Sequence, residues 1–132
     1  FPTRRSSDLA AIDSLVICKF TNMGVAEEYF ARALSAVTGI KYATGDLIRV
    51  GERVWNLERL YNLREGFTRA DDTLPPRLLQ EAIPDGPSKG WVNHLEPMLK
   101  EYYRARGWDE NGVPSRAKLE ELGLSEWMEV AA

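Results

Sequence analysis

The chain has 132 residues, 44% of them hydrophobic, and a formal net charge of -3 at pH 7. This composition is typical of one globular domain, and the even mixture of acidic and basic residues argues against nucleic acid as a partner. A lone cysteine excludes an internal disulfide, and no apolar run reaches the roughly 18 residues of a membrane-spanning helix. We therefore expect a cytoplasmic protein that does not act at a membrane.

The first nine residues, FPTRRSSDL, have no helical or strand periodicity. By composition they would pass as a flexible basic tail. They also resemble, at each of the nine positions, one reading frame of a common sequencing adapter. We interpret residues 1–9 as non-native and exclude them from the fold prediction. Residues 10–132 are then expected to be the C-terminal part of a longer chain.

Two long helices are predicted in the first half of the chain. Apolar residues at three- and four-residue steps predict a helix over residues 24–38, which Gly39 would end. Thr44 precedes a longer helical pattern over residues 44–63, with Asp46 in the first turn. The expected buried stripe of this helix consists of Leu47, Val50, Val54, Leu57 and Tyr61.

Turn-forming residues dominate the middle of the chain. The stretch TRADDTLPPR, residues 68–77, contains too many of them to continue a helix, and residues 83–90 are predicted to form a loop. Between these two segments, residues 77–82 are expected to make one or two helical turns.

Helical spacing returns in the last third of the chain. It follows Asn93 and stops at Gly107, and Ser115 then caps a short helix that buries Leu119 and Leu122. No segment alternates apolar and polar residues long enough for a half-buried strand. The predicted fold class is therefore all-α, a multihelical C-terminal segment of a larger protein.

Spacing alone defines no complete active site. We interpret His94 as a solvated or capping side chain, because no second histidine or cysteine lies near it. Asp71 and Asp72 are explained by turn and N-cap chemistry. Arg59 and Arg64 are expected to form weak ion pairs with glutamates on a helix surface.

The single cysteine, Cys18, lies among the apolar residues Val16, Ile17 and Phe20. By composition it is a small buried side chain. An iron–sulfur cluster normally needs four thiolates, so Cys18 could be a ligand only together with cysteines from outside this sequence.

Three stretches of the sequence resemble one family. VWNLERLYNLREGFTRADDTLPPRLL, residues 54–79, and EYYRARGWDENGVPSRAKLEELGL, residues 101–124, are similar to the C-terminal signature of the tungsten-containing aldehyde:ferredoxin oxidoreductase family. DSLVICKF, residues 13–20, then falls where that family carries the pattern Asp-x-x-Gly-Leu-Cys-x. The resemblance extends from Asp13 to Leu124, with the order and spacing of the motifs preserved.

The resemblance implies a cofactor role for the Asp13–Lys19 segment. Asp13 stands where the family binds one of two pyranopterin dithiolenes that coordinate tungsten or molybdenum, and Cys18 stands where it supplies the last of four ligands to a 4Fe-4S cluster. Ile17 and Lys19 fall at positions whose backbone approaches the pterin. A carboxylate suits this task because it can accept two parallel N–H bonds from the pterin edge. Val16 departs from the family pattern, which has glycine at this position.

The implied reaction is the oxidation of an aldehyde, with water, to a carboxylic acid, and the electrons pass through the cluster to ferredoxin. The implied partners are ferredoxin, a small aldehyde and an upstream part of the same chain, and a homo-oligomer is compatible with them. No catalytic residue is assigned, and the segment alone is not expected to be active. Two alternatives stay open: a stand-alone helical interaction module in which Cys18 is merely buried, and a degenerate subunit, for which Val16 is the only support.

Overall fold

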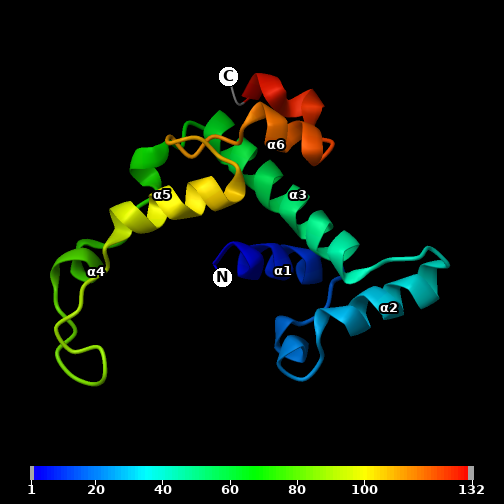
Figure 1. Ribbon diagram of the computed structural model, residues 1–132, viewed down its shortest axis with the longest axis horizontal. Coiled ribbons are helices and arrows are strands. Elements are labelled where there is room, and N and C mark those ends of the chain that lie inside the picture. The colour runs from blue at the N-terminus through cyan, green and yellow to red at the C-terminus, as the bar shows by residue number, and fades with distance from the viewer. Residues whose placement is uncertain (1, 131–132) are drawn as a thin grey trace.

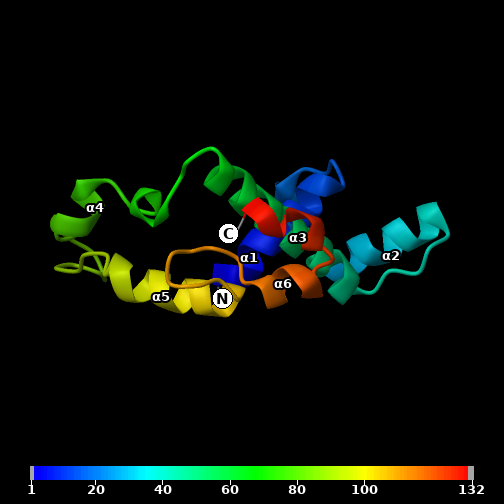
Figure 2. The same ribbon diagram turned by 90° about the horizontal axis from the view of Figure 1, so that it is seen from above.

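The computed structural model describes residues 2–130, with side chains from residue 6 to residue 129. Its elements are α1 (Pro2–Ser14), η1 (Lys19–Met23), α2 (Glu27–Thr38), α3 (Thr44–Arg64), η2 (Arg69–Asp71), α4 (Pro76–Gln80), α5 (Leu95–Arg106), α6 (Arg116–Glu121) and η3 (Ser125–Val130). No β-strand occurs in this part of the chain, which confirms the all-α prediction. The long helix α3 lies in the middle, and α2 and α4 lie toward opposite ends of the molecule (Figures 1 and 2).

Helix α1 packs closely against α3. A Cβ atom added to Gly51 would lie 1.9 Å from the carbonyl oxygen of Ser7, so only glycine permits this approach. The adjoining hydrophobic cluster contains Ala11, Ile12, Phe30, Ala31 and Leu47, and it joins α1, α2 and α3. Helix α1 runs without interruption through the boundary between residues 2–9 and the sequence from Ala10. The interpretation of residues 1–9 as non-native stays a prediction, and Phe1 and residues 131–132 lie outside the described part of the chain.

A second hydrophobic cluster joins the C-terminal part of the chain to α3. It consists of Leu60 from α3 with Leu119, Leu122 and Leu124 from α6 and the turn that follows. The Ser115 hydroxyl accepts a hydrogen bond from the backbone N–H of Lys118 at 3.2 Å, so the predicted N-cap is confirmed. This cluster fixes the C-terminal helices on the second half of α3.

Two predicted helix ends are confirmed by left-handed glycines. Gly39 ends α2 with φ 72°, and Gly107 ends α5 with φ 70°. The start of α2 differs from the predicted residue 24. Gly24 ends the turn η1, Ala26 is the extended N-cap residue of α2, and the helix begins at Glu27.

The predicted buried stripe of α3 is confirmed at Leu47, which is buried, and in part at Val54 and Leu57, which are half-buried. It is wrong at Val50 and Tyr61. Val50 is 37% exposed and Tyr61 is 57% exposed. The buried positions of α3 are Leu47, Gly51, Asn56, Arg59 and Leu60. Periodicity of apolar residues missed Asn56 and Arg59 because both are polar. The segment around Trp108 buries them by forming hydrogen bonds with their side chains. Across the described residues, no helix combines the length and apolar character that crossing a membrane requires.

Candidate functional site

The loop between α1 and η1 carries the residues that the sequence assigns to cofactor binding. Asp13 lies in the last turn of α1, and Cys18 directly precedes η1 as its N-cap residue. The backbone N–H of Val16 donates to the carbonyl oxygen of Asp13 at 2.9 Å, which closes the turn after the helix. One short loop therefore presents both a carboxylate and a thiol.

Val16 occupies an unusual backbone conformation in this loop. Its φ is 57°, and it is the sole residue other than glycine with a positive φ in the described part of the chain. A β-branched side chain disfavours this left-handed conformation, which glycine adopts at little cost. The side chain is 94% exposed, so no packing interaction compensates for the strain. The backbone thus keeps a glycine conformation although the sequence has valine.

Cys18 is exposed, so the prediction of a buried thiol is wrong. Its carbonyl oxygen accepts hydrogen bonds from the backbone N–H of Thr21 at 3.1 Å and from the Thr21 hydroxyl at 2.5 Å. These bonds hold the residue in place through its backbone and leave the sulfur accessible. Within residues 6–129, no group of three or more His, Cys, Asp or Glu side chains could hold a metal ion.

The other assigned residues divide between solvent and core. The Asp13 side chain is exposed and has no ion-pair or hydrogen-bond partner among the described residues. Ile17 is half-buried and packs against the cluster around Ala11 and Leu47. Its side chain is therefore used by the core, and only its backbone is available to a ligand. Lys19 is half-buried at the start of η1.

A buried polar site lies on the second half of α3, and it was missed from the sequence. The guanidinium of Arg59 donates to the two carboxylate oxygens of Asp72 at 2.8 and 2.6 Å, and its Nε donates to the carbonyl oxygen of Gly112 at 2.8 Å. The Arg59 guanidinium also lies 5.3 Å from the centre of the Trp108 ring. The predicted helix-surface ion pair of Arg59 is therefore wrong, whereas Arg64 does pair with Glu65, at 2.9 Å.

Tyr103 completes this site by donating its hydroxyl hydrogen bond to Asp72. Burial and this hydrogen bond to a carboxylate raise the pKa of Tyr103 to about 12. The neighbouring Asp71 behaves as predicted, since it accepts a hydrogen bond from the Thr68 backbone N–H at 2.7 Å and caps the turn. The hydrogen bonds from Thr68 lower the pKa of Asp71. Asp72 therefore anchors the loop after α3, and this cluster holds the fold together.

Neighbouring aromatic residues extend this structural role. The indole N–H of Trp108 donates to the Asn56 side-chain oxygen at 2.8 Å, and that of Trp55 donates to the Tyr102 hydroxyl at 2.7 Å. Tyr103 is buried and Tyr102 is half-buried. The only sequence signal for the cluster is the concentration of aromatic residues near residues 102–108, which does not identify Arg59 as their partner.

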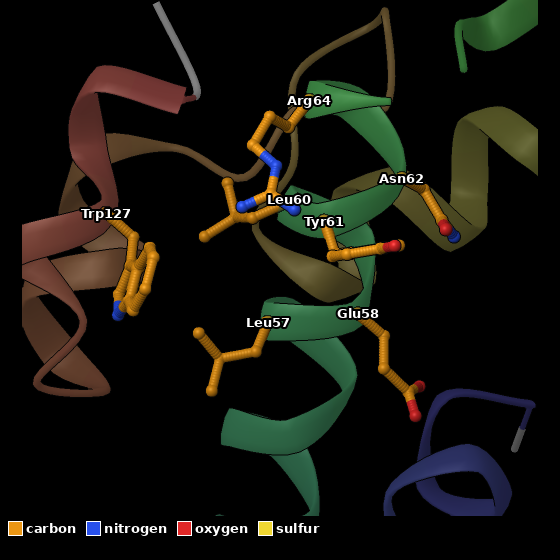
Figure 3. A pocket seen from close by; sticks show the side chains of 7 residues that line it. All are labelled: Leu57, Glu58, Leu60, Tyr61, Asn62, Arg64 and Trp127. Carbon is orange, nitrogen blue, oxygen red and sulfur yellow. The ribbon is translucent and has the colours of Figure 1, made fainter. Parts of the chain in front are cut away.

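A cavity of about 530 Å³ lies between α3 and η3. Figure 3 shows the Trp127 ring facing Leu57, whereas Glu58 points away from it. The cavity begins at Leu57, ten residues beyond Leu47. Leu47 belongs to the cluster against which Ile17 of the Asp13–Lys19 loop packs. At about 1.5 Å of rise per residue, the cavity is roughly 15 Å further along the helix. The cavity is thus separate from the Asp13–Lys19 loop.

The comparisons with known proteins assign this all-α chain to a class of oxidoreductases. The family model described as "Aldehyde ferredoxin oxidoreductase, domains 2 & 3" matches residues 4–124. The chain therefore belongs to the aldehyde ferredoxin oxidoreductase family.

Relatives from two archaea are nearly half identical to this chain over the region that matches. It is 46% identical to the tungsten-containing aldehyde ferredoxin oxidoreductase of Pyrococcus furiosus, over 89% of this chain and 20% of that protein. It is 46% identical to the protein of the same name from Thermococcus kodakarensis, over 92% of this chain and 20% of that protein. The chain thus spans about one fifth of the length of these relatives.

Two further matches have different names. An aliphatic sulfonate oxidoreductase, WOR-like subunit, of Pyrococcus furiosus is 36% identical over 89% of this chain and 20% of its own length. The solved active-site complex BamBC of benzoyl coenzyme A reductase, in complex with 1,5-dienoyl-CoA, matches with a TM-score of 0.63 and 25% identity. That match covers 80% of this chain and 15% of the solved chain. The same helical arrangement therefore occurs inside much longer chains.

Proposed function

We propose that the Asp13–Lys19 loop is a cofactor-binding element of an oxidoreductase that converts aldehydes to carboxylic acids. The observation that carries the proposal is the pairing, on one short loop, of an exposed thiol at Cys18 with an exposed, unpartnered carboxylate at Asp13. Membership of the aldehyde ferredoxin oxidoreductase family supports a pterin as the partner of Asp13 and an iron–sulfur cluster as the partner of Cys18.

The donor atoms fit a pterin and an iron–sulfur cluster. The Asp13 carboxylate can accept two N–H hydrogen bonds from the pterin edge, and no protein group competes for it among the described residues. The exposed Cys18 sulfur would serve as one thiolate ligand to iron. One thiolate is too few for a 4Fe-4S cluster, so the other three must come from protein outside these 132 residues. When bound, the tungsten or molybdenum pterin and the cluster supply the oxidation chemistry and the electron path.

The remaining residues of the loop act by position. Ile17 anchors the loop in the core cluster. The backbone of Ile17 and Lys19 would then contact the pterin. The proposal includes a small aldehyde as substrate, ferredoxin as electron acceptor, and the cytoplasm as the compartment. It assigns no acid–base residue to this chain, because the carboxylate and thiol of the loop are both used as ligands.

The test is a chimera in which residues 10–124 replace the matching fifth of the Pyrococcus furiosus relative. Purified without oxygen, the chimera should contain the iron and the electron paramagnetic resonance signal of a reduced 4Fe-4S cluster. Cys18→Ser should remove most of that signal, because the serine hydroxyl is a poorer ligand to the iron of the cluster than a cysteine thiolate. Asp13→Asn should keep the iron but lower the content of tungsten and pterin.

A matched control is Glu28→Gln, which neutralises another exposed carboxylate in the first turn of α2. It should change neither iron nor tungsten. Full iron content and an unchanged spectrum in Cys18→Ser would show that Cys18 is not a ligand. Unchanged tungsten and pterin in Asp13→Asn would remove Asp13 from the site.

A further inference from the structure

A long excursion between α3 and α5 has no buried residue. We define the arm as residues 67–98, which include η2, α4, the loop after α4 and the first turn of α5. No residue from 61 to 102 is buried. In Figures 1 and 2 the arm projects from the rest of the molecule, at the end opposite to α2.

Hydrogen bonds hold the arm in a defined shape. The backbone N–H and the side-chain amide of Asn93 both donate to the carbonyl oxygen of Leu78, at 3.2 and 3.0 Å. The backbone N–H of Ile83 donates to the carbonyl oxygen of Trp91 at 3.0 Å, and that of Gly90 donates back to Ile83 at 2.9 Å. These bonds close the loop but leave no side chain of the arm fully buried, although ordering such a loop costs conformational entropy.

Large apolar side chains are exposed along the arm. Trp91 is 66% exposed, Met98 56%, Phe67 53%, Leu78 45% and Ile83 43%. Leu78, Ile83 and Trp91 line one groove of about 480 Å³. A soluble monomer rarely leaves such a group of apolar residues in water, which marks the surface as an interaction site.

We propose that the arm docks, through Leu78, Ile83 and Trp91, onto protein equivalent to the other four fifths of a family-length chain. The family match spans the whole arm, so the arm is a feature of the family. In the curated relatives four fifths of the polypeptide lie outside the matched region and are available to cover it. The solved structural match covers 80% of this chain, and the part that it leaves uncovered is shorter than the arm. At least part of the arm is therefore matched within a longer chain.

Hydrogen exchange tests the docking directly. The exchange of arm amides is compared in the 132-residue chain alone, in the chimera that carries residues 10–124, and in the intact Pyrococcus furiosus relative at its matching segment. Arm amides should exchange at least about tenfold more slowly in the two long chains than in the short one. Equal exchange in all three would overturn the proposal. Protection of the short chain that rises with its concentration would show a second copy as the occupant and would also overturn it.

A pair of neighbouring substitutions in the chimera locates the contact. Trp91→Ser should abolish the protection of the arm, whereas Lys89→Ser, at an exposed polar position of the same loop, should preserve it. Protection that survives Trp91→Ser would exclude this surface. If the chimera does not fold, the exchange of the intact relative still decides the question. None of these measurements needs metal or activity. The docking of the arm can therefore be disproved while Cys18 and Asp13 prove to be ligands, and it can be confirmed if they prove not to be.

Discussion

The helices packed on α3 and the segment that follows α3 are ordered by different forces. We define the body as α1, α2, α3, α6 and η3, where the side chains of Ile12, Leu60 and Leu119 are completely or almost completely buried. The arm follows the C-terminal end of α3, and its backbone is fixed by hydrogen bonds over exposed side chains. Burial is the larger source of folding free energy, and a buried aliphatic side chain contributes about 1.5–3 kcal/mol.

The contrast teaches that a defined backbone is not evidence of independent stability. The body has two clusters that remove apolar surface from water and so favour its folded state. The arm has the turns and hydrogen bonds of a folded segment but no fully buried side chain. The arm is therefore ordered in a way that leaves its apolar side chains available for another surface to cover.

The largest effect is expected from a leucine substitution made once in each region. Leu119→Ala removes a fully buried side chain of the body and should lower the free energy of unfolding by about 2–5 kcal/mol. Leu78→Ala, at a 45% exposed position of the arm, should change it by less than about 0.5 kcal/mol in the same 132-residue chain. Urea unfolding of both variants measures the difference. A similar loss in both would mean that the arm contributes to the stability of the isolated chain.

The link between arm and body should give the next largest effect. Arg59→Ala removes the buried partner of Asp72 and should cost about 3 kcal/mol or more, because it leaves the carboxylate half-buried without its cation. Arg64→Ala, on the same helix, removes an exposed pair with Glu65 and should cost at most about 1 kcal/mol. Thermal and urea unfolding distinguish the two. Equal costs would show that the Arg59–Asp72 pair does not anchor the arm.

Tyr103 should give the same link a dependence on alkaline pH. Its pKa is raised to about 12 in the folded protein, so the unfolded chain, with an ordinary tyrosine, releases its proton first. Between about pH 10 and pH 12 the folded state binds more protons, and the free energy of unfolding falls by up to about 1.4 kcal/mol per pH unit. Below about pH 10 the contribution is complete.

The measurement is urea unfolding at several pH values from 9 upward. Tyr103→Phe should remove this part of the slope, while Tyr29→Phe, at an exposed position of α2, should leave it in place. Identical slopes in wild type and Tyr103→Phe would contradict the assignment. An intact alkaline slope in the variant would mean that other groups govern the link between arm and body.

Local chemistry predicts the elements of this molecule better than it predicts their contacts. Caps at Ser115, Gly39 and Gly107 are read correctly because they depend on residues next to them in the sequence. The Arg59–Asp72 pair depends on a loop that returns to α3, and apolar periodicity contains no information about that return.

The candidate site shows the same limit. Asp13 and Cys18 were found through a family pattern, and their ligand roles stay predictions. Their neighbours suggested that the Cys18 thiol is buried, but the structure exposes it. Apolar residues adjacent in sequence do not ensure burial, because the turn at Val16 directs successive side chains to different surroundings.

The smallest effect concerns that turn, and its sign is the informative part. Val16→Gly should raise the free energy of unfolding by about 1 kcal/mol. The substitution removes the cost of the left-handed conformation, which is about 1–2 kcal/mol for an L-residue. The larger loss of backbone entropy when glycine folds offsets part of this gain. The same substitution at the exposed Val37 in α2 should instead destabilise, since glycine is unfavourable inside a helix. Opposite signs in urea unfolding would show that the loop next to Cys18 is built for glycine and tolerates valine at a cost. Equal destabilisation at both positions would mean that Val16 does not hold this conformation in solution, and the loop would then present Asp13 and Cys18 differently from the arrangement described above.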